Sequence, residues 1–263
     1  MGDFIRKCKE AFDEALFPSN IYCICCGSLI DGTRNYSLCD DCMKKLHWIN
    51  GRSCDKCGKS LPDTYRGSLC YDCMTYSHSF VRGYSCLTYG FYERQLLMAY
   101  KYGGRGYFSR KFGDMLYDRI CCEELEVDVI IPIPIHRKRE RTRGYNQSAL
   151  MAERLSDLWG VPADAKSFVR VKNTPFLRSL SPAERQARME GAFEPAGRGA
   201  ERVKGKRVLM VDDIYTTGAT ADAFAETLTE AGAEGAWLIT LASGGNRRPK
   251  EIKSAYHTCG PGL

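Results

Sequence analysis

The sequence predicts an α/β protein with a parallel sheet, preceded by a small cysteine-rich domain. Three observations support this prediction. Eight cysteines form four C-x-x-C pairs within residues 21–76. Strand and helix patterns alternate over residues 77–263, which is typical of a sheet with parallel strands. One strand in that region, 208–211, ends in two aspartates that are followed by a glycine-containing loop and a helix.

The composition is that of an ordinary globular protein. Of 263 residues, 44% are hydrophobic and 27% are charged. The longest apolar run, 129–135, is interrupted by Pro132 and Pro134 and is too short to span a membrane. The N-terminal segment has no apolar signal region, so a cytoplasmic protein without membrane insertion is expected. The net charge of +6 is compatible with phosphate-rich partners and is too small to predict nucleic-acid binding.

Residues 1–20 form the first predicted element, an amphipathic helix. Phe4, Cys8, Phe12 and Leu16 recur every four residues, and Pro18 ends the pattern. We expect the apolar face to dock on the body of the protein rather than on a membrane.

Residues 21–76 contain one cysteine-rich unit twice. Each cysteine of the first two pairs recurs 31 residues later, and Gly27 is matched by Gly58. Such a repeat indicates a duplicated structural unit. Two C-x-x-C turns can aim four thiolates at one ion and complete a tetrahedral zinc site. We therefore predict a double zinc ribbon with the ligand sets Cys23, Cys26, Cys39 and Cys42, and Cys54, Cys57, Cys70 and Cys73.

A cross-braced arrangement, in which each copy borrows ligands from the other, is the alternative to this sequential pairing. In either case four thiolates leave no open coordination position, so the two zinc ions are expected to be structural. Cys25 adjoins two ligands and is a competitor for one of their places. The other cysteines have no ligand spacing and are predicted to be small buried hydrophobic residues: Cys8, Cys86, Cys121, Cys122 and Cys259.

The larger domain is expected to begin at residue 77. The pattern predicts a strand over 80–89, helices over 93–101 and 108–122, and a buried strand over 127–133. Three glycines separate the two helices. Helix and strand patterns continue to the end of the chain.

The segment 208–220 carries the strongest functional signal. Its loop is expected at the carboxyl edge of the sheet, where ligands of such folds bind. Gly218, three threonine hydroxyls and the start of the following helix suit a phosphate group. Asp212 and Asp213 would repel that phosphate unless they serve ribose hydroxyls or hydrated Mg²⁺. The alternative is that Asp213 and Thr217 merely form a turn and a helix cap.

A basic segment follows the proline-rich strand. Five basic residues lie within seven positions: Arg137, Lys138, Arg139, Arg141 and Arg143. Concentrated positive charge suits a departing pyrophosphate, whereas most charge runs are solvated surfaces. We predict that Arg143, Gly144 and Tyr145 lie near the pyrophosphate and that the earlier basic residues are more exposed.

The segment 208–220 resembles the phosphoribosyl diphosphate (PRPP) signature of type I phosphoribosyltransferases. Nearly the whole chain resembles the ComF family, whose members join a cysteine-rich ribbon region to that fold. The resemblance rests on 131–136, on Arg143-Gly144-Tyr145-Asn146-Gln147, and on the Lys101-Tyr102-Gly103-Gly104-Arg105 element. It implies that Asp212 and Asp213 hold the ribose hydroxyls and that the 5′-phosphate is wrapped by Tyr215, Thr216, Thr217, Gly218, Ala219 and Thr220. Lys101 and Arg105 are further substrate-binding candidates.

Two functions follow as hypotheses. The first is Mg²⁺-dependent transfer of a phosphoribosyl group from PRPP to a nitrogen acceptor, with Asp212 and Asp213 at the catalytic centre. Arg185 and Arg188, on a loop bounded by Pro182 and Gly191, would close over the substrate. Leu177 and Arg188 stand in that loop where the family pattern has Gln and Asn. This departure concerns what the resemblance implies about the chemistry of the acceptor.

The second hypothesis is a non-catalytic competence protein that binds single-stranded DNA. The resemblance implies a link to DNA uptake and partners among DNA-uptake or helicase proteins. Basic residues interleaved with aromatic ones at 100–111 suit single strands, with Arg105 and Tyr107 as the exposed candidates and most other aromatics in the core. The sequence contains no G-x-x-x-x-G-K-[ST] phosphate loop and no H-E-x-x-H motif.

Overall fold

The computed structural model describes residues 20–174 and 182–246. Its centre is a parallel sheet of four strands in the order β1-β6-β5-β2. These are β1 (Gly83–Thr88), β6 (Gly235–Ser243), β5 (Arg207–Tyr215) and β2 (Val129–Pro132). β3 (Phe168–Arg170) and β4 (Phe193–Pro195) form a separate antiparallel pair. The predicted α/β class with a parallel sheet is confirmed.

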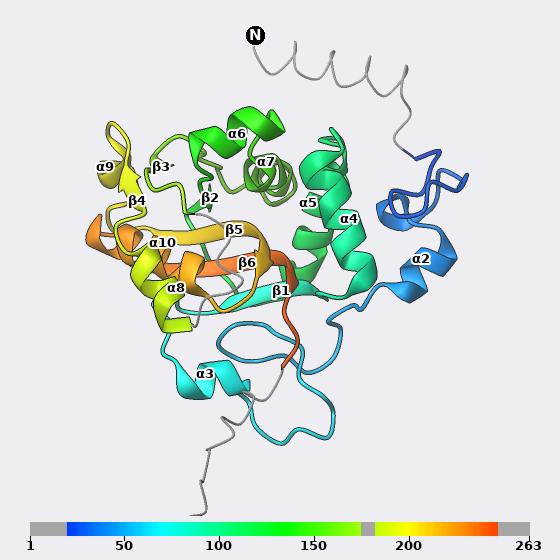
Figure 1. Cartoon of the computed structure of the whole chain (residues 1–263), viewed down its shortest axis with the longest axis horizontal. Coiled ribbons are helices and arrows are strands. Elements are labelled where there is room, and N and C mark those ends of the chain that lie inside the picture. Colours follow the sequence, from blue (N-terminus) through cyan, green and yellow to red (C-terminus); the bar gives the residue numbers. More distant parts are fainter. Residues whose placement is uncertain (1–19, 175–181, 247–263) are drawn as a thin grey trace, which may run out of the picture.

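Helices and two ribbon copies surround the sheet (Figure 1). The ribbon copies contain the short helical elements η1 (Asn35–Ser37), α2 (Asp40–Lys45) and α3 (Tyr71–Thr75). The larger domain contains α4 (Phe91–Tyr102), α5 (Phe108–Ile120), α6 (Arg137–Arg143), α7 (Gln147–Trp159), α8 (Pro182–Met189), α9 (Gly199–Val203) and α10 (Ala219–Glu230). No helix among the described residues is long and apolar enough to cross a membrane.

The sheet is buried on both faces because successive side chains of a strand point to opposite sides. In β5, Leu209 and Val211 pack into a core with α4, α5 and α7. Val208 and Met210 pack into a second core with α10. The first ribbon copy contributes Cys23, Leu38 and Leu46 to the first core, whereas the second copy contributes Cys54, Leu61 and Cys70 to the second. The duplicated unit is therefore attached to both faces of one sheet.

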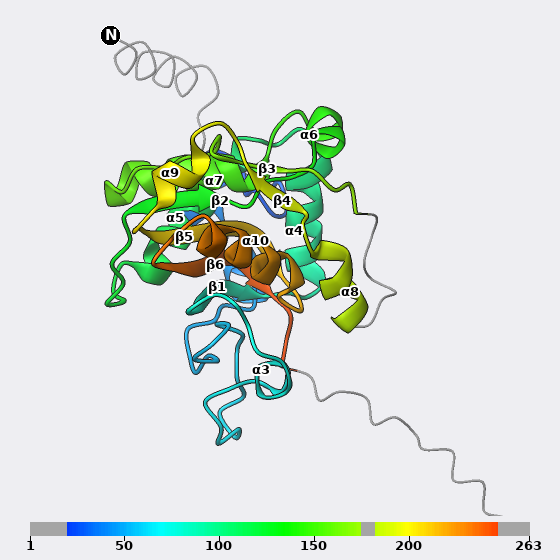
Figure 2. The same ribbon diagram turned by 90° about the vertical axis from the view of Figure 1, so that its left-hand side faces the viewer.

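The two ribbons also lie apart in space. Figures 1 and 2 show α3 and its ribbon projecting from the sheet on the side opposite α6 and α9. The first ribbon lies beside α5, where the Tyr36 hydroxyl donates to Asp118 Oδ2 at 2.5 Å. The amphipathic helix expected over 1–20 falls, apart from Asn20, outside the described residues.

Three local predictions are wrong. The segment from Pro182 was expected to be a loop, but it begins α8, because proline suits the first helical position and Glu, Ala, Gln and Arg favour helices. β5 does not end at Val211 but continues through both aspartates to Tyr215, because β6 pairs with it as far as Tyr215–Ser243. Cys121 and Cys122 are exposed rather than buried, since they follow the last residue of α5 in a surface turn.

Candidate ligand pocket and metal centres

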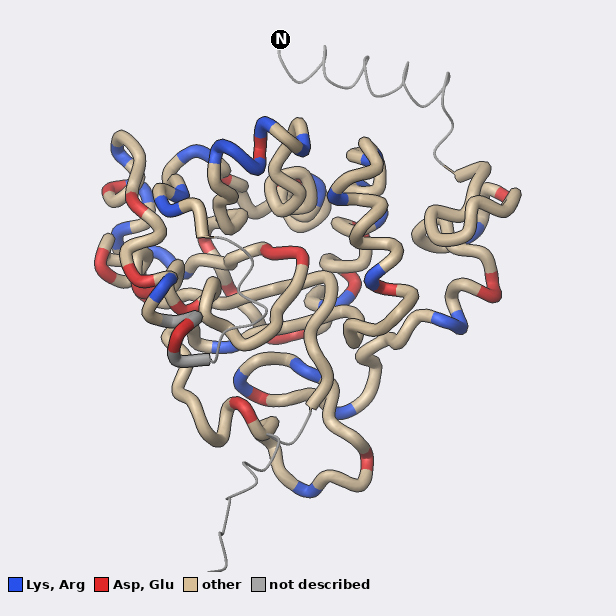
Figure 3. Tube along the Cα trace, in the orientation of Figure 1, with Lys and Arg blue, Asp and Glu red and all other residues tan. Residues whose placement is uncertain are grey.

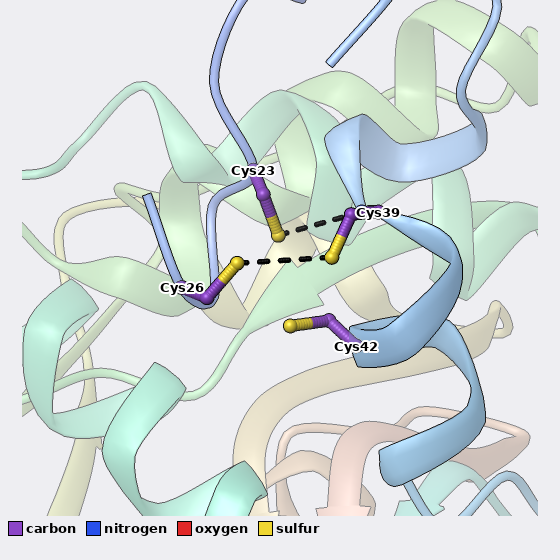
Figure 4. A group of neighbouring side chains, drawn as sticks. All are labelled: Cys23, Cys26, Cys39 and Cys42. Atoms are coloured by element: carbon purple, nitrogen blue, oxygen red, sulfur yellow. Dashed lines mark hydrogen bonds between the residues drawn. The ribbon is translucent and has the colours of Figure 1, made fainter. Parts of the chain in front are cut away.

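The two cysteine clusters are grouped in sequence order, one in each ribbon copy. The sulfurs of the first cluster, Cys23, Cys26, Cys39 and Cys42, lie within 4.8 Å of one another. Figure 4 shows these four side chains converging on one place. The sulfurs of Cys54, Cys57, Cys70 and Cys73 also lie within 4.8 Å of one another in the second copy. The Sγ atoms of Cys26 and Cys39 are 3.7 Å apart, and those of Cys57 and Cys70 are 3.6 Å apart. Tetrahedral zinc with Zn–S bonds of about 2.3 Å requires sulfurs roughly 3.8 Å apart, so both sets fit structural zinc.

Backbone groups support each cluster. Gly27 and Gly58 have φ of 76° and 73°, and their amides donate to the carbonyls of Cys23 and Cys54. The Cys39 and Cys70 amides donate to Cys23 Sγ and Cys54 Sγ at 3.4 and 3.2 Å. Such N–H···S contacts stabilise the thiolate form that binds metal.

One pocket lies at the carboxyl ends of β5 and β2 and brings most of the predicted site together. Asp212, Asp213 and residues 214–221 form one wall. Lys101, Arg139, Arg143 and Arg170 provide positive charge around the rest, together with Gln147, Ser148 and Thr174. Figure 3 shows several Lys and Arg positions, in blue, along α6 above the sheet.

The two aspartates have different surroundings. Asp213 Oδ2 lies 2.6 Å from Lys101 Nζ, and both side chains are largely buried. Asp212 Oδ1 accepts hydrogen bonds from the Asp213 amide at 2.8 Å and from Ser148 Oγ at 3.3 Å. Burial, and then the charge of Asp213, raise the pKa of Asp212 to about 7. The interpretation of Asp213 as a mere helix cap does not fit, because α10 begins six residues later with Gly218 at its N-cap.

The loop after the aspartates has the geometry of an anion cradle. Gly218 adopts φ 90°, a left-handed conformation that favours glycine. α10 then begins at Ala219, and the first amides of a helix have no partner within it. Thr216, Thr217 and Thr220 line the same wall. Unpaired amides, hydroxyl donors and the helix dipole all favour a phosphate here.

The arginines reach the pocket from α6 and β3 rather than from β5. Arg143 donates to Gln147 Oε1 at 3.0 Å and lies 5.2 Å from the centre of the Tyr102 ring. Arg139 donates to the Thr174 carbonyl at 2.5 Å and is half-buried like Arg143, although it was predicted to be the more exposed of the two. The helical spacing of α6 places Arg139 and Arg143 on one face, while Arg137, Lys138 and Arg141 remain exposed.

Some predicted residues lie elsewhere. Four predicted site residues that the structure describes do not line the pocket: Gly144, Tyr145, Arg105 and Arg188. Tyr145 donates to the Tyr100 carbonyl at 2.6 Å, and Arg105 lies over the Phe108 ring. Gly144 is the left-handed C-cap of α6, and Arg188 is exposed on α8. The Arg185 side chain is outside the described part of the chain.

The pocket also contains residues that sequence reasoning did not select. Arg170 is 9% exposed, and burial followed by the charge of Arg139 lowers its pKa to about 10. Gln147 is 1% exposed, and its Nε2 has no hydrogen-bond partner among the described residues. Because Arg143 can only donate, Gln147 must turn its oxygen toward Arg143, which leaves its buried amide nitrogen without a hydrogen-bond partner among the described residues.

The aromatic residues near Lys101 divide into core and surface groups. Tyr100 and Phe108 are fully buried. Tyr102 and Tyr107 are 52% and 60% exposed. Arg105 and Arg110 are exposed on the same stretch of chain. An exposed surface with rings and positive charge therefore adjoins the Arg143 side of the pocket.

Comparison with known families identifies both parts of the chain. A double zinc ribbon domain matches residues 12–74, and a phosphoribosyl transferase domain matches residues 147–259. Similar curated proteins include competence protein F of Haemophilus influenzae, 31% identical over 53% of this chain and 62% of that protein. Competence protein ComFC of Bacillus subtilis is 29% identical over 53% of this chain and 50% of its own length.

The DNA utilization protein YhgH of Salmonella typhi is 33% identical over 40% of this chain and 45% of its own length. The chain thus spans between 45% and 62% of the length of these curated relatives. Among solved structures, the glutamine PRPP amidotransferase from B. subtilis is 23% identical, with a TM-score of 0.37 over 54% of this chain and 30% of that one. A purine phosphoribosyltransferase from Pyrococcus horikoshii is 22% identical, with a TM-score of 0.31 over 51% of this chain and 72% of that one.

Proposed function

Because the chain belongs to the ComF family, which joins a double zinc ribbon to a phosphoribosyltransferase-like domain, we propose that it binds PRPP with Mg²⁺ and serves DNA uptake. The competence and DNA-utilization names belong to its relatives and support the second part of this proposal. The pocket geometry supports the first part.

One observation carries the proposal: a single pocket is lined by an acid pair, an anion cradle and a group of arginines. PRPP carries the complementary groups, namely ribose hydroxyls, a 5′-phosphate and a pyrophosphate. The loop 215–220 would bind the phosphate through its amides and hydroxyls. Asp212 and Asp213 would accept hydrogen bonds from the ribose, and Arg139 and Arg143 would face the pyrophosphate.

Mg²⁺ suits this ligand and this donor set. It takes oxygen ligands, keeps several waters and is usually bound through substrate phosphates with one or two carboxylates. Asp212 and Asp213 are the described carboxylates in the pocket. When bound, Mg²⁺ would neutralise part of the pyrophosphate charge. The Lys101–Asp213 ion pair holds one carboxylate in place before the ligand arrives.

Transfer of the phosphoribosyl group would use the same groups. The bond from ribose C1 to the pyrophosphate oxygen breaks with its electron pair leaving on pyrophosphate, and a bond from C1 to the acceptor nitrogen forms. Negative charge therefore grows beside Arg139 and Arg143, which stabilise it. Positive charge grows on the ribose beside Asp212 and Asp213. Pyrophosphate release with nucleobases or ammonia as acceptors measures this reaction.

Calorimetric titration of the zinc-loaded protein with PRPP, with and without Mg²⁺, tests the proposal. We expect Mg²⁺-dependent binding that weakens by at least about a hundredfold in Asp212→Asn/Asp213→Asn, because each charged hydrogen bond contributes roughly 1.5–3 kcal/mol. Glu123→Gln/Glu124→Gln, an adjacent acid pair outside the pocket lining, is the matched control and should bind normally. Absence of PRPP binding by the wild-type protein would refute the proposal.

Binding of single-stranded DNA is a second candidate function, and the exposure of Tyr102 and Tyr107 beside Arg105 and Arg110 favours it. Base stacking on a tyrosine contributes roughly 1–3 kcal/mol, so Tyr102→Ala/Tyr107→Ala should weaken binding of a labelled oligonucleotide by at least about tenfold. Affinity should also fall linearly with salt concentration on a double logarithmic plot. Tyr76→Ala, at another exposed tyrosine, is the control. Salt-independent binding, or equal loss in the control, would contradict this function.

A further inference from the structure

A buried polar network lies directly beneath the phosphate loop. The His78 side chain is 1% exposed, and its Nδ1 lies 2.9 Å from Asp222 Oδ2. On the other side of the ring, Nε2 lies 3.2 Å from the Tyr215 hydroxyl. The carboxylate of Asp222 can only accept, so Nδ1 carries the proton and Nε2 accepts from Tyr215. All three polar side chains are thereby satisfied in one chain of hydrogen bonds.

The loop rests on this network. A Cβ placed on Gly218 would lie 2.7 Å from His78 Cε1 and 2.9 Å from the Tyr215 hydroxyl, so no larger residue fits there without displacing them. The Asp222 amide donates to the Gly218 carbonyl at 2.8 Å. Asp222 therefore holds the left-handed turn through its backbone and His78 through its side chain.

The same network is attached to the second ribbon. Lys59, which is 2% exposed, lies 5.3 Å from the centre of the Tyr215 ring and forms an ion pair with Asp72 of α3. Phe80 stacks on His78 at 5.1 Å and belongs to the core that contains Cys54 and Cys70. The second Asp222 oxygen accepts from the Ser79 amide at 3.0 Å, which ties the chain leaving this ribbon to α10.

We propose that His78, Asp222 and Tyr215 are positioning residues that hold the phosphate loop in its binding conformation, with the second ribbon as their anchor. The proposal rests on the proposed function in one respect, namely that the loop binds phosphate. The His78 and Asp222 side chains act through Gly218, from the side of the loop that faces the ribbon. A loop ordered before binding loses less conformational entropy on binding, so the network should strengthen phosphate affinity.

Hydrogen exchange of the zinc-loaded, ligand-free protein tests the network without relying on PRPP. In His78→Gln, we expect the amides of 216–221 to exchange about tenfold faster than in the wild type. His47→Gln is the control for the same substitution in a second histidine–carboxylate pair, because His47 Nδ1 lies 3.0 Å from Glu93 Oε1 at the start of α4, with the His47 side chain largely exposed. Tyr215→Phe removes only one hydroxyl and should give a smaller increase. If His78→Gln does not fold, the Tyr215→Phe variant provides the test instead.

Titrations with inorganic phosphate and with PRPP then separate positioning from a merely structural role. We expect His78→Gln to bind both ligands about tenfold more weakly, and His47→Gln to bind them as the wild type does. Unchanged loop exchange in a folded His78→Gln or Tyr215→Phe protein would overturn the proposal. Faster exchange with unaltered phosphate and PRPP affinity would overturn it as well. If the wild type binds no PRPP, the proposed function fails, whereas exchange of the loop still decides the network.

Discussion

At the scale of single residues, Asp212 shows how the pocket is prepared for a ligand. Its carboxylate lies at the end of a buried strand beside a second aspartate, and these surroundings raise its pKa to about 7. Because the folded pKa exceeds the unfolded value of 3.8, the ionised form costs free energy of folding. Asp212 therefore contributes to wild-type stability at low pH, where its carboxyl is protonated, and this contribution is lost as the pH rises toward 7.

Asp212→Asn should therefore stabilise the ligand-free protein while weakening PRPP binding. We expect its free energy of unfolding to exceed that of the wild type by roughly 1–3 kcal/mol at pH 8, because a neutral amide replaces a buried, crowded charge. The difference should shrink as the pH falls from 7 to 5.5. Urea denaturation of zinc-loaded proteins across this range measures it, with Asp63→Asn as an exposed control. A variant that is less stable at pH 8 would contradict this account of Asp212.

The residues of the pocket differ in how far the sequence could predict them. Asp212, Asp213 and Gly218 lie in one contiguous segment whose spacing alone predicts a strand, a turn and a helix start. Gln147 stood in a motif that was recognised, but its buried and unpartnered amide is a property of packing. No local sequence pattern pointed to Arg170 as a site residue, because a three-residue strand, β3, distant in sequence from the aspartates, brings it to the pocket.

At the scale of elements, local patterns predicted α4, α5 and α10 and the strands β1, β2 and the first part of β5, but they did not locate α7 or β6. They did not predict the strand order, in which β6 lies between β1 and β5, because order depends on contacts between distant segments. The end of β5 was also missed, since pairing with β6 overrides the low strand preference of aspartate.

The short helices also could not be predicted from local sequence patterns. α6 has seven residues and α8 has eight, so each is marginal without the packing around it. His136 caps α6 by accepting from the Lys138 amide at 3.2 Å. That cap begins the helix, and the helical spacing then turns Arg139 toward the pocket, which the run of basic residues alone does not predict.

At the scale of the whole molecule, one duplicated unit has two different attachments. The first ribbon packs with α5 in the core on one face of the sheet, and the second packs with α10 and Tyr215 on the other face. The repeat in the sequence predicted two similar units and could not show this asymmetry, because it arises from which core each copy joins. The two zinc sites should therefore differ in their effect on the ligand pocket.

Matched variants of the two ribbons test this difference. Cys39 and Cys70 occupy equivalent positions, at the N-caps of α2 and α3. Each serine substitution should lower the zinc content by about one ion per chain, since each removes one of four thiolate ligands. Cys70→Ser should weaken PRPP binding by about tenfold or more, because loss of the second zinc loosens Lys59 and Phe80 beneath the phosphate loop.

Cys39→Ser should leave PRPP affinity within about twofold of the wild type, because the first ribbon contacts α5 and the opposite core. Metal analysis, circular dichroism and calorimetry on the same samples separate zinc loss from unfolding. Equal loss of affinity in both variants would mean that the ribbons act only through overall stability. Full affinity in a Cys70→Ser protein that has lost one zinc would mean that the second ribbon does not need its metal to support the loop.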